Sequence, residues 1–243
     1  MRQMANTKTY FNWSSGKDAA LALYYLQKEG KYKVDKLLTS VNEFHNRVAM
    51  HGLRSVLLMQ QAKAIGLPLT TVHLPEEPSM EDYNHIMETT VQELQNEGYQ
   101  HCGFGDIFLE DLRAYREAQL KPFGIHAHFP LWKQDTKALL EAFIGLGFKA
   151  IVICTKAALL DKSFVGRELD ASFINDLPAN VDPCGEHGEF HTFCYDGPIF
   201  KEPVKFSLGE KVYRAYKAPT DSDMSAETSD MGFWFCDLIP AQD

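Results

Sequence analysis

The sequence lacks a long hydrophobic run, a closely spaced pair of cysteines and an excess of positive charge. No stretch of about 18 apolar residues occurs, which excludes an ordinary transmembrane helix. The 5 cysteines form an odd set without a C-x-x-C pair, so we expect reduced thiols and no disulfide scaffold. The first ten residues, MRQMANTKTY, lack the apolar core and cleavage site of a secretory signal. Together these absences predict a cytoplasmic location.

The charge balance is acidic. The chain has 24 Lys+Arg against 33 Asp+Glu, a formal net charge of −9, which weighs against broad electrostatic binding to nucleic acid. Hydrophobic residues make up 45% and charged residues 23% of the 243 residues, as in an ordinary globular protein. No repeat or low-complexity stretch is visible. The length suits one large domain, alone or with a small appendage.

Short apolar runs alternate with helix-period segments over the first 160 residues. Strands are expected at Thr9–Trp13, Lys36–Val41, Leu69–His73, His101–Phe104, His126–Phe129 and Lys149–Thr155. Helices are expected at Ala19–Gln27, Leu53–Ile65, Met80–Gln95 (with Ser79 as N-cap), Leu109–Leu120 and Thr136–Leu146. This alternation predicts an α/β fold with a doubly wound, mostly parallel, Rossmann-like sheet.

The pattern changes after about residue 160, where proline, glycine and aromatic residues become more frequent. The stretches Glu189–Tyr195, Lys205–Leu208, Lys211–Tyr216 and Phe233–Ile239 have the character of strands. We expect residues 1–160 to form the sheet domain and residues 161–243 a smaller α+β region that faces a substrate. The aromatic tail near Phe233–Phe235 packs either on the chain's own sheet or against a second copy in a homo-oligomer.

A short polar loop, Ser14-Ser15-Gly16-Lys17-Asp18, joins the first strand to the first helix. Small residues let the backbone approach a ligand, free amides at a helix N-terminus point at an anion, and Lys17 adds positive charge. The loop is neither a Walker-type P-loop, because Asp18 follows Lys17, nor a G-x-G-x-x-G turn. On composition alone, a phosphate site and a plain helix start are equally compatible with it.

The loop resembles the SGGxDS signature of the PP-loop ATP pyrophosphatases, whose members cleave ATP to AMP and pyrophosphate. The loop departs from this signature at two positions. Ser15 stands where the signature has glycine, and Ala19 stands where it has serine. Ser15 is small enough for the loop, while Ala19 removes one hydroxyl donor. We therefore expect rearranged pyrophosphate contacts and a retained site.

Three further stretches narrow the resemblance to one branch. They are Gly103–Ile107 (GFGDI), Pro130–Lys133 (PLWK) and Cys184–Phe193 (CGEHGEFHTF), the last followed by Asp196–Phe200. In this order they resemble the motifs of the diphthine–ammonia ligase family over about residues 8–203. The resemblance implies adenylation of a carboxylate by ATP and attack by ammonia, releasing an amide, AMP and pyrophosphate.

Roles for individual residues follow from that resemblance. The ATP-binding residues are expected to be Ser14, Ser15, Gly16, Lys17, Asp18 and, in the loop after the second strand, His51. Mg2+ needs only one or two carboxylates beside water and phosphate, and Asp18 and Asp106 are the candidates. Asp106, Glu186 and Glu189 are expected to be catalytic, with the two glutamates orienting ammonia or accepting its proton. His191, Gly185 and Gly188 are expected to contact the acceptor.

His191 is the main departure from the family pattern, since an acid stands at that place in EYET where this chain has Glu189-Phe190-His191-Thr192. A neutral or positive group there changes which acceptor is tolerated. The family's acceptor, diphthine, belongs to translation elongation factor two of archaea and eukaryotes. A bacterial chain would need another acceptor.

Other interpretations stay open. Cys184, His187, His191 and Cys194 have a spacing that also suits zinc, although His191 and Cys194 point to opposite faces of a strand. Cys102 and Cys154 each lie at the end of a predicted strand, and paired cysteines carry sulfur in tRNA-thiolating members of the same superfamily. A module that binds ATP or AMP without turnover is the alternative outside enzymes.

Overall fold

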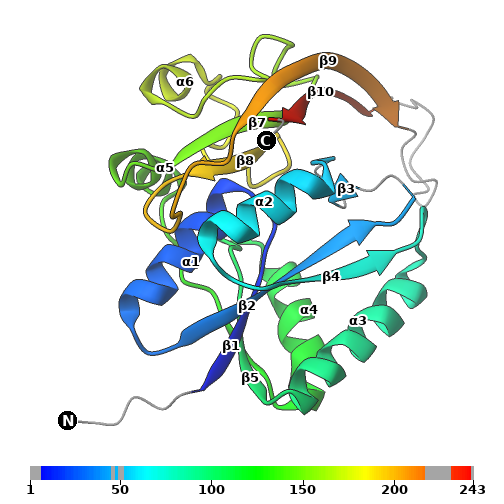
Figure 1. Cartoon of the computed structure of the whole chain (residues 1–243). Coiled ribbons are helices and arrows are strands. Elements are labelled where there is room, and N and C mark those ends of the chain that lie inside the picture. The colour runs from blue at the N-terminus through cyan, green and yellow to red at the C-terminus, as the bar shows by residue number, and fades with distance from the viewer. Residues whose placement is uncertain (1–6, 45–46, 49–51, 217–230, 242–243) are drawn as a thin grey trace.

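The computed structural model describes residues 7–44, 47–48, 52–216 and 231–241, which form two sheets and their covering helices (Figure 1). The strands of the first sheet are β1 (Lys8–Asn12), β2 (Lys33–Asn42), β3 (Arg47–Val48), β4 (Leu69–Leu74), β5 (Tyr99–Gly103) and β6 (His126–His128). Those of the second are β7 (Lys149–Lys156), β8 (Phe190–Asp196), β9 (Phe206–Tyr216) and β10 (Met231–Pro240). The helices are α1 (Lys17–Glu29), α2 (Ser55–Ile65), α3 (Met80–Asn96), α4 (Glu110–Leu120), α5 (Thr136–Gly145) and α6 (Ala171–Asp176), with a short 3-10 helix at Lys121–Phe123.

The first sheet is parallel except for β3. Strand β1 lies between β2 and β5, β4 pairs with the far side of β2, and β6 pairs with β5. Strands β2 and β4 therefore extend the sheet on one side of β1, and the later strands β5 and β6 extend it on the other side. The order of strands reverses between β1 and β5, and in such sheets ligands bind beyond the carboxyl ends at this point. The predicted doubly wound α/β sheet is confirmed.

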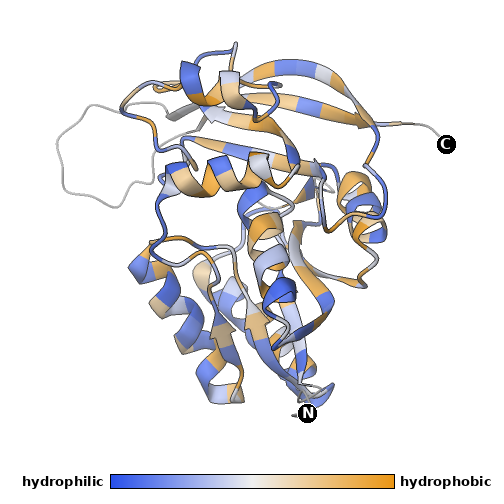
Figure 2. Cartoon of the chain, turned by 90° about the vertical axis from the view of Figure 1, so that its left-hand side faces the viewer, coloured by the Kyte–Doolittle hydropathy of each residue, from blue (hydrophilic) through white to orange (hydrophobic). Residues whose placement is uncertain are grey.

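Alternation along β1 separates the two faces of this sheet. Phe11 packs into a core that includes the apolar sides of α1 and α2, whereas its neighbour Tyr10 packs into a second core with residues of α3. Successive strand residues point to opposite faces, so both faces of the sheet are buried. Figure 2 shows polar and apolar residues in alternation along the helices, as expected where one side of each helix is buried.

The N-terminus of α3 illustrates how local sequence sets an element boundary. Ser79 accepts a hydrogen bond from the backbone N–H of Asp82, and the carboxylate of Asp82 accepts one from the Ser79 N–H, which together form a capping box. The predicted N-cap is confirmed. No helix within the described residues is long and apolar enough to span a membrane.

The second sheet is antiparallel, in the order β8-β7-β10-β9. The stretch Lys149–Thr155 is a strand as predicted, but it does not complete the parallel sheet, because its partners are β8 and β10. The two stretches Lys205–Leu208 and Lys211–Tyr216 belong to one strand, β9. The aromatic residues near Phe233 pack within this sheet, where β10 pairs with β7 and β9.

Candidate functional site: a phosphate cradle facing a group of carboxylates

The loop between β1 and α1 lies at the point where the strand order reverses. Gly16 is the N-cap of α1, and its backbone N–H lies 3.4 Å from Ser14 Oγ, to which it donates. Ser15 has a φ of 69°, in the left-handed region that favours glycine, and its side chain is fully buried. Its Oγ has no hydrogen-bond partner among the described residues. A buried donor without a partner in this cradle fits a phosphate oxygen.

Lys17 is tied to the second sheet and to its own neighbour. Its backbone N–H donates to Thr192 Oγ1 over 3.0 Å, and its ammonium donates to the Cys184 carbonyl and to Asp18 Oδ2, 2.7 Å away. Its side chain is only 4% exposed. Burial acts to lower the pKa of Lys17, but the negative charge of Asp18 and its neighbours raises it overall. Lys17 is thus a fixed positive charge at the N-terminus of α1.

Four acidic side chains, Asp18, Asp106, Asp182 and Glu186, interact around this charge. Burial raises the pKa of Asp18 above its ordinary value, against the opposing effect of Lys17, and the charge of Asp182 raises it further. Burial, then the charge of Asp18, raises the pKa of Glu186 to about 7, with Asp106 and Asp182 adding to the effect. The raised pKa values of Asp18 and Glu186 show that negative charge is concentrated here, and a bound cation would relieve it.

Asp106 follows β5 and is held by an arginine. Its Oδ2 lies 2.7 Å from Arg116 Nε, and the Arg116 guanidinium stacks 4.6 Å from the Phe104 ring. The preceding Gly105 packs directly on the start of α1, where an added Cβ would lie 2.9 Å from the Ala19 backbone nitrogen. Only glycine fits this contact, which brings the GFGDI stretch against the phosphate cradle.

Two carboxylates shape the loop before β8. Asp182 Oδ1 accepts from the backbone N–H groups of Cys184 and Glu186, over 2.8 and 3.2 Å. Glu189 accepts at both carboxylate oxygens, from the N–H of Asp182 over 3.1 Å and from that of His187 over 2.8 Å. Both oxygens of Glu189 thus bind the backbone, so its side chain holds the loop in shape.

Gly185 is the tightest point of this loop. It has a φ of 70°, and an added Cβ would lie 2.9 Å from the Phe190 carbonyl oxygen. A larger residue would push the loop off β8, and with it Glu186. Gly188 also has a positive φ, of 78°, but open space around it. The structure therefore places Gly185 and Gly188 in the turn that presents Glu186.

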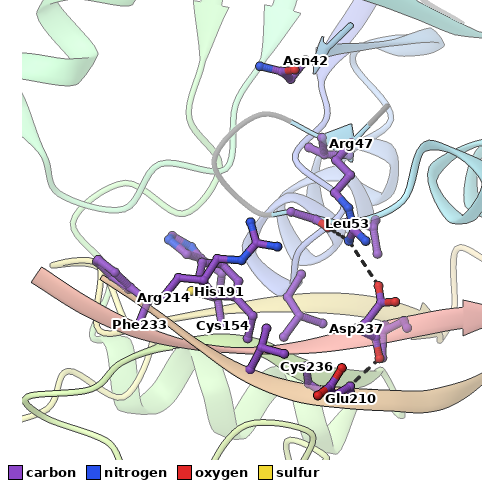
Figure 3. Close-up of a pocket in the computed structure, with 16 residues that line it drawn as sticks. Asn42, Arg47, Leu53, Cys154, His191, Glu210, Arg214, Phe233, Cys236 and Asp237 are labelled. Atoms are coloured by element: carbon purple, nitrogen blue, oxygen red, sulfur yellow. Dashed lines mark hydrogen bonds and ion pairs between the residues drawn. The ribbon is translucent and has the colours of Figure 1, made fainter. Parts of the chain in front are cut away.

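His191 lies in β8 and lines a cavity of about 670 Å³ between the two sheets (Figure 3). It is a neighbour in the chain of Thr192, which binds the phosphate loop. The structure thus separates His191 from the Lys17 and Glu186 group, which does not line this cavity. His51 lies outside the described residues.

Three contributing residues had no role assigned from the sequence, although Thr192 stands within the CGEHGEFHTF stretch. Gln61 of α2 is fully buried and joins Trp13 Nε1 to the carbonyls of Ser15 and Cys194. Thr192 caps the helix through Lys17, and Arg116 holds Asp106. Each acts through a contact that the fold creates, and the sequence alone does not show these contacts.

The site fits magnesium better than zinc. No group of three or more His, Cys, Asp or Glu within the described part of the chain has metal-binding geometry. Mg2+ does not need such a cage, since it keeps water and phosphate ligands. Asp18, whose side chain is 28% exposed, is available to it, whereas Asp106 would have to leave Arg116. The cysteines of the thiolation interpretation are in different sheets, Cys102 in β5 and Cys154 in β7.

Comparison with known proteins agrees with the motifs. The model for the diphthamide synthase N-terminal domain matches residues 7–126, and the model for the diphthamide synthase C-terminal domain matches residues 135–221. A diphthine–ammonia ligase of Danio rerio is 30% identical over 177 residues, 62% of this chain and 65% of the relative. The one from Schizosaccharomyces pombe is 32% identical over 126 residues, 47% of this chain and 21% of the relative.

The human diphthine–ammonia ligase is 26% identical over 148 residues, 59% of this chain and 54% of that protein. The chain thus spans less than two thirds of the length of these relatives. Among solved structures, a U34-tRNA thiolase from Methanococcus maripaludis has a TM-score of 0.36 and 16% identity, over 58% of each chain. With two family models matching in sequence over most of its length, the chain belongs to the diphthamide synthase family.

Proposed function

We propose that the chain is an ATP-dependent, AMP-forming carboxylate–ammonia ligase. The observation that carries the proposal is the phosphate cradle of Ser15 to Lys17 set against the carboxylates Asp18 and Glu186. Transfer of AMP needs positive charge and amide donors at the phosphates, and ammonia needs an acceptor for its proton. Both requirements meet at this edge of the sheet. The names of the relatives as diphthine–ammonia ligases support the same reaction.

The reaction has two steps. A carboxylate oxygen of the acceptor attacks the α-phosphorus of ATP, the bond to the bridging oxygen breaks, and pyrophosphate leaves with that electron pair. Ammonia then attacks the acyl carbon of the mixed anhydride, and AMP leaves with the electrons of the C–O bond. The nitrogen loses one proton in this second step, so the products are an amide, AMP, pyrophosphate and a proton.

Each side chain has a distinct part in these steps. The α1 amides, Ser15 Oγ and the Lys17 ammonium bind the phosphates and stabilise the charge on the leaving pyrophosphate. Bound Mg2+, held through Asp18, would neutralise phosphate charge. Glu186 takes the proton from ammonia. Asp106 and Glu189, both expected to be catalytic, act by position, Asp106 through Arg116 and Glu189 through the loop that presents Glu186.

The test is an assay for AMP and pyrophosphate with ATP, Mg2+, ammonium and carboxylate acceptors. Asp18→Ala should abolish AMP formation while the melting temperature changes by a few degrees at most. Glu186→Gln should retain ATP binding and slow amide formation. Glu141→Gln, an exposed site on α5, is the matched control and should behave as the unchanged protein. ATP-dependent thermal protection without AMP under any acceptor would instead support a nucleotide-binding module.

Other expectations remain part of the proposal. We propose a cytoplasmic location, and an acceptor carboxylate that is carried by a protein if the acceptor is diphthine. The assignment of residues 1–160 to ATP binding and of residues 161–243 to acceptor binding also remains a prediction. The second sheet already begins at residue 149, with β7.

A further inference from the structure

Strand β9 lies at the outer edge of the second sheet (Figure 1). It has 11 residues and pairs with β10 on one side, while its other side has no strand partner among the described residues. No proline interrupts it, and two of its apolar side chains, Leu208 and Tyr213, are each 50% exposed. An edge strand of this length offers a row of backbone N–H and C=O groups to another strand.

Two opposite charges lie on one face of β9. Glu210, Val212 and Arg214 all line the cavity between the sheets, as expected for alternate residues of a strand. Glu210 and Arg214 are four residues apart, about 13 Å along the strand, so they are too distant to pair with each other. Neither forms a salt bridge with any of the residues that the structure describes. Both charges are therefore available to a partner.

Antiparallel pairing of two β9 strands brings these charges together in one register. In such a pair related by a two-fold axis, residues whose numbers have a constant sum lie opposite each other. With Val212 opposite Val212 of the second copy, each Glu210 lies opposite an Arg214, and each Lys211 lies opposite a Tyr213. Opposite charges across two strands stabilise a sheet, and so does a cation beside an aromatic ring.

Neighbouring registers lack this match. A register centred on Glu210, Lys211 or Arg214 sets that residue against its own copy, and like charges directly opposite each other destabilise a sheet. With Tyr213 at the centre, neither Glu210 nor Arg214 meets an opposite charge. The charges of β9 thus favour the register centred on Val212 and disfavour the others.

We propose that the chain forms a homodimer through β9, in which the second sheets of two copies join across a two-fold axis at Val212. The inference goes beyond the ligase proposal and does not depend on it. Glu210 of each copy then lies beside Arg214 at the cavity of the other, so the second copy contributes a charge to each cavity. One pair of strands is a small interface, so we expect monomer and dimer to exchange at micromolar concentrations.

The test reverses the charges and measures mass by sedimentation velocity across the micromolar range. The unchanged chain should dimerise as its concentration rises. Glu210→Arg and Arg214→Glu each set like charges opposite each other twice, so each variant alone should associate at least about tenfold more weakly. An equimolar mixture of the two variants should dimerise again, because every charged pair in the mixed dimer then has opposite signs. Lys205→Glu, a charge reversal at an exposed residue just before β9, is the matched control and should dimerise as the unchanged chain does.

Three results would overturn the dimer through β9. They are a chain that stays monomeric at the highest concentration, a dimer that both single variants retain, and single variants that lose the dimer but do not regain it when mixed. Melting temperatures of the variants show that each is folded. A dimer that never releases AMP would refute the ligase proposal alone, whereas AMP release by a chain that stays monomeric would refute only the dimer.

Discussion

At the scale of single residues, Ser15 has two features in the phosphate loop that each disfavour folding. It holds a left-handed φ of 69° without being glycine, and it buries a hydroxyl that has no partner among the described residues. A residue kept in such a state at a ligand-binding loop is typical of a site whose partner is a ligand. The resemblance placed a glycine here, so the hydroxyl is a feature of this chain.

Ser15→Ala tests whether that hydroxyl serves ATP. The change keeps the backbone shape and removes the unsatisfied group, so the free energy of unfolding without ligand should rise by about 1 kcal/mol. ATP affinity should fall several-fold, because one phosphate donor is lost. Urea unfolding and calorimetry measure the two quantities, with the exposed Ser207→Ala as control. A loss of stability together with unchanged ATP affinity would show that the hydroxyl is structural.

At the scale of elements, the strands β5 and β6 carry a histidine cluster away from the phosphate loop. His101 Nδ1 lies 2.8 Å from His128 Nε2, and the Tyr32 ring lies 4.1 Å from that of His128. Burial, with the charges of His101 and His126, lowers the pKa of His128 to about 4, against an opposing effect of Glu29. The fold therefore favours neutral His128.

The sign of the pH effect follows from this depressed pKa. The unfolded chain binds the proton near the ordinary value of about 6.5, and the folded chain only near pH 4, so the contribution to stability is complete above about pH 6.5 and is lost as pH falls toward 4. His128→Gln should reduce the loss of stability between pH 7 and pH 5. Urea midpoints at both pH values measure it, and the exposed His73→Gln should retain the full loss.

The strand β7 shows where prediction from sequence succeeds and where it ends. The run KAIVICT, apolar from Ala150 to Cys154, predicts a strand, which is confirmed, and the structure buries this strand on both faces. The same run suits the middle of a parallel sheet and the middle of an antiparallel one. Its partners β8 and β10 are distant in the chain, and only long-range pairing assigns it to the second sheet.

In the candidate site, too, some features could be predicted from the sequence and others depend on the fold. Small residues and the helix start made the loop of Ser14 to Asp18 recognisable, and the structure places it where the strand order reverses. The role of Glu189 could not be predicted from the sequence. A glutamate in this motif suggests a reactive acid. In the structure, however, both of its carboxylate oxygens accept hydrogen bonds from backbone amides, and these bonds form only when the loop folds.

At the scale of the whole molecule, the two sheets share one core. Buried residues of α1 and α2 belong to the same apolar cluster as those of β7 and β8. Gln61 adds a polar connection within it, since its side chain accepts from Trp13 Nε1 over 2.7 Å and donates to the Ser15 and Cys194 carbonyls. One side chain thus joins α2, the phosphate loop and β8.

Gln61→Leu should therefore affect stability and ATP binding together. Leucine of similar size leaves a buried indole N–H and two carbonyls without this partner, and such losses cost about 1–3 kcal/mol each before relaxation. We expect the free energy of unfolding to fall by about 2–4 kcal/mol, as one transition by both fluorescence and circular dichroism. ATP affinity should also weaken, because the Ser15 carbonyl is no longer held. Gln134→Leu, which removes one hydrogen bond at the surface, should change both by little. Two separate transitions in the unchanged protein would mean that the sheets unfold independently, and that Gln61 does not couple them.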